Sequence, residues 1–85
     1  MKTYKASYWA ERGEWQLGIN EDDENGKEIA FWKNEQLDEL VEDGYLNRKH
    51  VDSLAISAIN YLAIECKAIE KPCKLIVDDK VYICR

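Results

Sequence analysis

Glycine, histidine and proline are scarce in this chain of 85 residues, which contains four Gly, one His and one Pro. The scattered glycines form neither a GxGxxG turn nor a Walker phosphate loop. With His50 as the only imidazole, no Ser-His-Asp or Cys-His arrangement and no four-ligand zinc site can be proposed. We therefore expect a protein that is not an enzyme and that needs no cofactor or metal.

Long apolar runs and paired cysteines are also missing. No stretch approaches the ~18 apolar residues of a membrane span, and residues 1–9 show no apolar segment before a small-residue cleavage site. The three cysteines, Cys66, Cys73 and Cys84, lack CxxC spacing. Such a pattern is typical of reduced thiols, so we expect a cytoplasmic protein with three free cysteines.

A calcium loop is suggested by the acidic turn that ends at Gly26. Oxygen ligands at loop positions one, three and five are provided by Glu21, Asp23 and Asn25, with glycine at position six. Position twelve, however, is Trp32, which cannot bind a cation. A solvated acidic turn is the better interpretation.

The composition indicates one folded acidic domain over residues 1–85. With 46% hydrophobic and 11% aromatic residues, the chain can build a core. The net charge is −5, which argues against direct nucleic-acid binding and against an anionic membrane surface, since both depend on Lys and Arg.

The longest apolar-periodic run extends from Arg48 to Glu70 and is followed by Pro72. At ~100° per residue its apolar side chains share one broad face. They are Val51, Leu54, Ala55, Ala58, Ile59, Leu62, Cys66 and Ile69. We predict an amphipathic helix over this run, with Asn47 as its N-cap, lying on a sheet. Glu65 at the margin of the face is either buried or solvated.

Alternating side chains predict three strands before this helix. Residues 2–10 and 15–20 alternate, and Arg12-Gly13 between them can form a hairpin turn. A third strand over Lys27–Lys33 is apolar on both faces, so we expect it to be central or covered on both sides. These strands should form an antiparallel meander.

A short helix is predicted over Glu35–Asp43, with Asn34 as its N-cap and Gly44 at its end. Its inward side chains should be Leu37, Leu40 and Val41.

Two further strands are predicted after Pro72, over Cys73–Val77 and Lys80–Cys84. A turn at Asp78-Asp79 would place Cys73 opposite Cys84, and a single long edge strand is the alternative. The whole predicts an α+β fold. Its small antiparallel sheet comprises the three-stranded N-terminal meander plus a C-terminal strand or hairpin, packed against one long and one short helix.

Acidic residues are concentrated in residues 21–43. Ten carboxylates against two lysines leave −8 there, so the remainder of the chain carries +3. The ten are Glu21, Asp22, Asp23, Glu24, Glu28, Glu35, Asp38, Glu39, Glu42 and Asp43. A segregated charge of this size steers partners of opposite charge. We predict that these residues bind a basic surface on a larger protein; a merely solvated loop and helix face is the alternative.

Aromatic residues are expected on both faces of the small sheet. We expect Trp9, Trp32 and Tyr82 on the face opposite the core residues of the second strand. Either the helices cover part of that face, or an aromatic patch is exposed and marks an interface. Trp9 and Trp32 therefore join the predicted partner-binding residues.

The hairpin sequence YKASYWAERGEWQLGI and the order strand, strand, strand, helix, strand resemble HicB-type antitoxins. The Leu-Pro-Gly step typical of that family after the second strand is missing, and the helix over residues 35–43 is additional. The small acidic format is similar to phage-encoded inhibitors of host defence, including anti-CRISPR proteins and DNA mimics. These resemblances imply either stoichiometric inhibition of a protein with a basic, nucleic-acid-binding site, or toxin neutralisation or self-assembly through an apolar helix or edge strand. A homodimer is left open.

Overall fold

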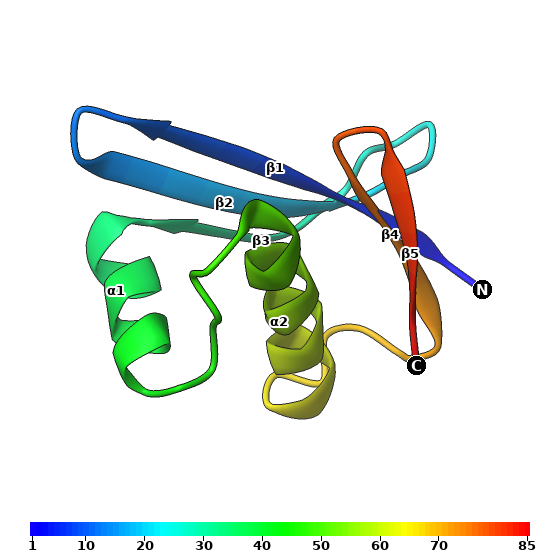
Figure 1. The fold of residues 1–85 in the computed structure, drawn as a ribbon. Helices are drawn as coiled ribbons and strands as arrows, with labels where there is room; N and C mark the ends of the chain where they lie inside the picture. Colours follow the sequence, from blue (N-terminus) through cyan, green and yellow to red (C-terminus); the bar gives the residue numbers. More distant parts are fainter.

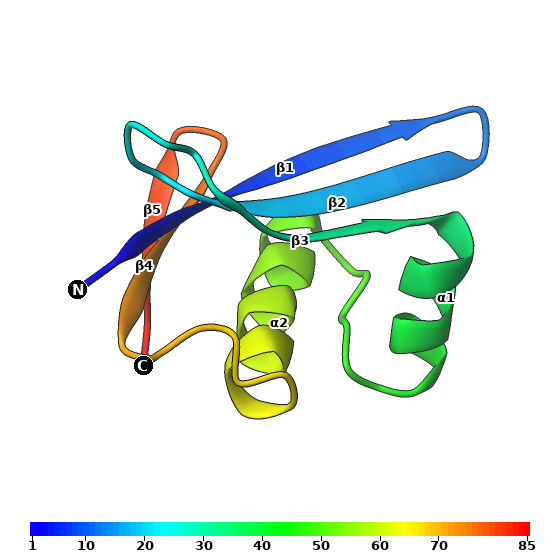
Figure 2. The ribbon, with the colours of Figure 1, turned by 180° about the vertical axis from the view of Figure 1, so that it is seen from behind.

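Five strands form one sheet, and two helices cover one of its faces (Figure 1). The computed structural model describes residues 1–85. The strands are β1 (Thr3–Glu11), β2 (Glu14–Glu21), β3 (Glu28–Lys33), β4 (Cys73–Val77) and β5 (Lys80–Cys84), and the helices are α1 (Asn34–Glu42) and α2 (Val51–Ile64). The view from behind shows the same layers, with the other face of the sheet uncovered (Figure 2). The predicted α+β class is confirmed.

Strand β1 lies at the centre of the sheet, whose strand order is β3-β2-β1-β4-β5. It pairs antiparallel with β2 and parallel with β4, so the sheet is mixed rather than wholly antiparallel. The parallel pair arises because the chain crosses the sheet through both helices and returns beside the start of β1. Connections of this kind bring a later strand in alongside an earlier one in the same direction.

Strand β3 lies at an edge of the sheet, so the prediction of a central or doubly covered strand is wrong. The two apolar faces of β3 lie in different environments. Trp32 is partly buried against the helices, while 43% of the Phe31 surface remains exposed on the other side. An apolar pattern on both faces of a strand therefore reflected one covered face and one face left open to solvent.

The hydrophobic core lies between the sheet and α2. It contains seventeen buried residues, contributed by every strand except β3 and by both helices. Helix α2 contributes Leu54, Ala55, Ala58, Ile59 and Leu62, and the facing strand residues include Leu17, Ile19, Leu75 and Val77. The face predicted for this helix is confirmed over these five residues, because they recur at the helical period.

Helix α2 is shorter than the predicted run of residues 48–70, since it begins at Val51 and ends at Ile64. His50, rather than Asn47, is its N-cap. Asn47 Oδ1 instead accepts a hydrogen bond from the Lys49 backbone N–H at 3.0 Å. At the other end Lys67 has φ 52°, and the chain folds back so that Ile69 reaches the core from a loop. The helical spacing of apolar residues in the sequence thus extends past the end of the helix.

The predicted short helix is confirmed within one residue at each end, and its inward residue Leu37 is fully buried. Gly44 ends it with φ 83°, as a left-handed C-terminal residue should. The N-cap is Lys33 instead of Asn34. Asn34 Oδ1 accepts a hydrogen bond from the Trp15 backbone N–H at 2.9 Å, which ties the start of α1 to β2.

The C-terminal strands form a hairpin, so the alternative of one long edge strand is excluded. Cys73 lies opposite Cys84, and Val77 lies opposite Lys80, as the turn at Asp78-Asp79 predicts. Asp78 adopts φ 55°, a left-handed conformation that Asp tolerates better than most residues.

Helix α2 is connected to β5 through Asp52. The Tyr82 hydroxyl and the Lys80 ammonium both donate hydrogen bonds to Asp52 Oδ2, the latter at 3.2 Å. The Tyr82 hydrogen bond and, less strongly, the hydrogen bond and positive charge of Lys80 hold the pKa of the Asp52 carboxyl below its ordinary value. Tyr82 therefore lies on the helix-covered face, and its predicted position on the opposite face is wrong.

Substituting Leu62→Ala should lower the free energy of unfolding by ~2–5 kcal/mol, because it leaves a cavity in the core. Leu62 is almost fully buried between α2 and the sheet. Ile64→Ala in the same helix is the control, since 63% of Ile64 is exposed and its loss should be within ~0.5 kcal/mol. Denaturant unfolding measures both values, and equal losses would show that the assigned face of α2 is wrong.

Substituting Asp52→Asn should lower the melting temperature at neutral pH but not in strong acid. The carboxylate has a depressed pKa in the folded state, so its contribution is present above its unfolded pKa and disappears as pH falls through the folded value. Thermal melts at about pH 7 and about pH 2 test this. A difference between the two proteins that persists unchanged at the lower pH would contradict the assignment.

Candidate protein-binding surfaces

The ten carboxylates of residues 21–43 do not form one surface, because β3 separates them. The loop from residue 22 to residue 27 lies at one end of β3 beside the β4–β5 hairpin, and α1 lies at the other end (Figure 1). Six residues of extended chain span about 20 Å. The predicted acidic segment is therefore divided into a loop group and a helix group.

In the loop group, two carboxylates serve the fold itself. Glu21 forms an ion pair with the Lys2 ammonium at 2.8 Å. Asp23 Oδ1 accepts hydrogen bonds from the backbone N–H groups of Asn25 and Gly26, both at 2.9 Å. This closes the loop in the manner of an Asx turn. Only Asp22 and Glu24 remain exposed and without an internal partner.

In the helix group, Asp38 also has an internal role. Its Oδ1 accepts a hydrogen bond from the Trp15 indole Nε1 at 3.1 Å and lies 3.7 Å from the Arg48 guanidinium. The guanidinium in turn covers the Trp15 ring, 4.0 Å from its centroid. Trp15 is buried, and a buried indole N–H requires an acceptor. The sequence could signal that a buried Trp15 needs an acceptor, but only the fold identifies Asp38 as that acceptor.

The three other acidic residues along the exposed side of α1 have no internal partner. Glu35, Glu39 and Glu42, here called the acidic stripe, follow one another at intervals of four and three and so share one helix face. All three are exposed, and none forms an ion pair within the chain. The last turn of α1 contains no basic residue, although negative charge there opposes the helix dipole by a few tenths of a kcal/mol.

Trp9 and Trp32 lie on opposite faces of the sheet, so the predicted patch containing both is wrong. Trp32 pairs with Leu17 and points toward the helices, where its ring meets Tyr61 edge to face at 6.2 Å. Trp9 pairs with Gln16 on the uncovered face, and 43% of its surface is exposed. Phe31 lies on this uncovered face in place of Trp32.

Two of the ten predicted acidic residues lie outside both groups or at their limit. Glu28 starts β3 and pairs with Asn20, so it belongs to the uncovered sheet face. Asp43 is the C-cap of α1, and its exposed carboxylate lies next to Gly44 at the end of the acidic stripe.

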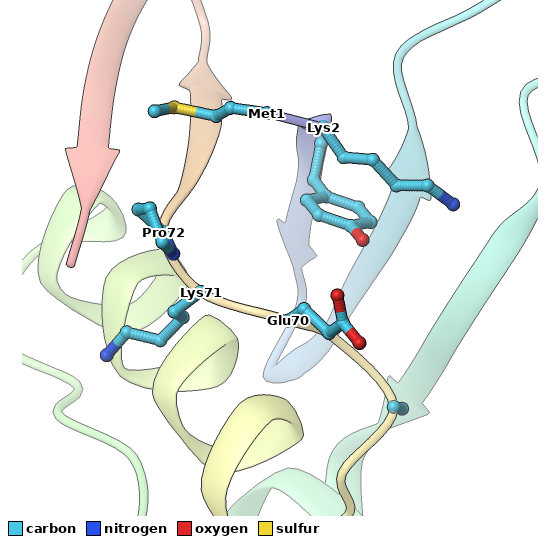
Figure 3. Close-up of a pocket in the computed structure, with 7 residues that line it drawn as sticks. Met1, Lys2, Glu70, Lys71 and Pro72 are labelled. Atoms are coloured by element: carbon cyan, nitrogen blue, oxygen red, sulfur yellow. The ribbon is translucent and has the colours of Figure 1, made fainter.

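The largest cavity, about 680 Å³, opens where the start of β1 meets the loop before β4 (Figure 3). It is lined by Met1, Lys2, Tyr4, Ala68, Glu70, Lys71 and Pro72. Its two lysines are already engaged, Lys2 by Glu21 and Lys71 by Asn60 Oδ1. Neither lysine is therefore free to recognise an anionic ligand. Nowhere in the chain do three His, Cys, Asp or Glu side chains gather as metal ligands.

Of the remaining reactive side chains, Cys73 and Cys84 are neighbours across the β4–β5 hairpin. Cys73 and Cys84 are buried and free, and burial raises the pKa of both thiols. Cys66 is free and exposed. Glu65 is exposed, so of the two interpretations of this carboxylate the solvated one holds.

Comparisons with protein-family models, curated proteins and solved structures return no match. The resemblance to HicB-type antitoxins therefore stays a prediction from the first hairpin and the element order. Neither helix is long and apolar enough to cross a membrane.

Thiol labelling of the native protein should show one fast and two slow cysteines. Cys66 is exposed, whereas Cys73 and Cys84 are buried and have raised pKa values, and only the thiolate reacts. A chromogenic disulfide reagent at about pH 8 measures the rates. After denaturation without reductant the total should be three. A total of one would show that two of the cysteines are bridged.

Proposed function

We propose that this chain is a non-enzymatic protein-binding module whose acidic stripe occupies a basic site on a larger protein. The observation that carries the proposal is the set of unpaired carboxylates at Glu35, Glu39 and Glu42. Three of the other acidic residues are used within the fold: Glu21 by Lys2, Asp38 by Trp15 with Arg48, and Asp23 by backbone N–H groups. The acidic stripe has no such internal use.

The stripe suits recognition of arginine and lysine. A helix holds its carboxylates at fixed spacing, and each carboxylate can accept two parallel hydrogen bonds from a guanidinium. The acidic stripe also belongs to a chain of net charge −5. Its negative charge attracts a basic partner from a distance and accelerates encounter. Since the stripe lies on α1, away from the α2 core contact, binding there requires no rearrangement of the fold.

The finer form of the proposal is a stoichiometric inhibitor acting in the cytoplasm. A rigid row of carboxylates can occupy a site that otherwise binds nucleic-acid phosphates, since both present closely spaced negative charges. This would be inhibition in the manner of phage-encoded defence inhibitors such as anti-CRISPR proteins and DNA mimics. This part of the proposal is supported by the negative charge of the acidic stripe and by the small size of the acidic chain. It does not rest on a relationship to those inhibitors.

A second candidate is a HicB-like antitoxin or self-assembling accessory domain that binds through apolar contacts. The observation that favours it is the uncovered sheet face with Trp9 and Phe31. The two candidates differ in their dependence on salt, because exposed charges are screened over about 8–10 Å at physiological ionic strength and apolar contacts are not.

Neutralising Glu35→Gln and Glu39→Gln together should slow association with the partner about tenfold or more at low salt. The difference should shrink as salt rises. Folding should change little, because exposed charges contribute within ~0.5 kcal/mol each. The partner is first captured from host lysate on the immobilised wild-type protein, identified by mass spectrometry and purified for kinetic measurements.

The matched control is Asp22→Asn with Glu24→Gln, which removes the same net charge from the loop group. This control should reduce the association rate much less than the α1 variant. Equal reduction by both would mean that net charge alone governs encounter. No reduction by either would leave the acidic stripe as a solvated helix face and favour the apolar candidate.

A further inference from the structure

The uncovered face of the sheet contains a hollow of about 260 Å³ over β1, β2 and β3. Trp9 and Phe31 border it, and 43% of the surface of each is exposed. Gly18 of β2, which pairs with Phe31, lies in its lining and has no side chain to fill it. The volume is below the roughly 300–1,000 Å³ of sites for drug-sized ligands. The hollow therefore suits a single side chain.

Two oxygen acceptors in the lining of the hollow have no donor within the chain. Glu28 is exposed and forms no ion pair. Asn20 Nδ2 donates a hydrogen bond to the Gly26 carbonyl oxygen at 3.0 Å. Asn20 Oδ1 then lies over the floor, 3.7 Å from the point that a Cβ atom of Gly18 would occupy. Because a carboxylate and an amide oxygen only accept hydrogen bonds, the matching ligand is a donor.

The charge of the hollow is negative. Glu28 is the only charged side chain in its lining. Lys5, which pairs with Asn20, and Lys33 lie on the same face of the sheet but do not line the hollow. Lys33 Nζ is 5.7 Å from the centroid of the Phe31 ring, within the ~6 Å of a cation–π contact. The Phe31 ring is thus placed where a cation can approach it, and the hollow beside it favours a cationic ligand.

We propose that this hollow, here called the aromatic hollow and defined by Trp9, Gly18, Asn20, Glu28 and Phe31, binds an arginine side chain of a partner protein. A guanidinium is planar, stacks on aromatic faces and has only hydrogen-bond donors. Its plane can lie against an aromatic ring while its N–H groups donate to the Glu28 carboxylate and to Asn20 Oδ1. A lysine ammonium has the charge but no plane to stack, so it matches the hollow less well.

The aromatic hollow and the acidic stripe are separate sites. Helix α1 lies on the covered face of the sheet (Figure 1), and the aromatic hollow lies on the opposite face. Binding of arginine here uses neither Glu35 nor Glu39, so the inference goes beyond the proposed function and does not depend on it. It also gives Trp9 and Phe31 a charged occupant in place of the apolar one that self-assembly would supply.

Titration of the ¹⁵N-labelled protein with N-acetyl-arginine amide, at constant ionic strength and about pH 7, tests the site by nuclear magnetic resonance. The signals of the Trp9 indole N–H and the Gly18 backbone N–H should shift together with a dissociation constant of about 1–10 mM, as expected for one side chain. Shifts confined to α1 would place the cation on the acidic stripe; they would overturn this inference and leave the proposed function intact.

Two related probes separate the plane from the charge. N-acetyl-citrulline amide has nearly the same shape as the arginine probe but is neutral, and it should bind at least about fivefold more weakly. N-acetyl-lysine amide is charged but not planar, and it should bind at least about threefold more weakly. Equal affinity of either probe and the arginine probe would overturn the assignment to arginine.

Substitutions at the aromatic hollow locate the contacts. Glu28→Gln should weaken binding of the arginine probe about tenfold, because it removes a charge-assisted acceptor. Glu14→Gln is the matched control: it removes the same charge from the same face of the sheet but lies outside the hollow, and its effect should stay below about twofold. Equal weakening by both variants would show that net charge alone attracts the probe, and would overturn the site.

Phe31→Leu tests the aromatic contact, since it keeps apolar bulk and removes the ring. Binding of the arginine probe should weaken at least about fivefold, with the spectrum of the folded protein retained because Phe31 is partly exposed on an edge strand. An unchanged affinity would overturn the stacked arrangement. Should Phe31→Leu fail to fold, the comparison of Glu28→Gln with Glu14→Gln still decides, because both carboxylates are exposed.

Discussion

The packing of α2 across the middle of the sheet is the interaction on which the rest of this structure depends. Leu54 and Ile59 lie in one buried cluster with Leu17 and Leu75, which come from the strands on either side of β1. Because a chain of this length buries only about 60–65% of its unfolded surface, it has one helix–sheet layer and no material for a second. One face of the sheet is consequently covered and the other is left to water or to a partner.

Side-chain alternation made much of the fold predictable, because it is set locally by the backbone. The register of the C-terminal hairpin was predicted correctly. The turn at Asp78-Asp79 and the alternation of the flanking apolar residues indicate the same strand pairing. The helices and the buried face of α2 followed from the helical period for the same reason. The end of α2 did not, because Ile69 satisfies that period from a loop.

Strand order and the choice of covered face could not be derived locally. Trp32 and Phe31 are adjacent aromatic residues of one strand, and only the position of α2 decides which of them is covered. The same limit applied to the acidic segment. Its charge was evident from composition, but the internal roles of Asp23 and Asp38 depend on a turn and on an indole that only the fold brings near. The acidic stripe, whose carboxylates have no such internal role, is a smaller and better defined surface than the whole acidic segment.

The parallel pairing of β1 with β4 has a consequence for how the chain folds. Thr3 meets Lys74, so roughly seventy positions must be closed into a loop before this pair contributes, and such distant contacts slow folding. The meander of β1, β2 and β3 joins neighbours in sequence and can form early. Until β4 and β5 arrive, however, the inner edge of β1 has no partner and the core lacks Leu75 and Val77. Strands β4 and β5 thus complete the sheet around β1, and this fold remains unfinished until Cys84 at the end of β5 has left the ribosome.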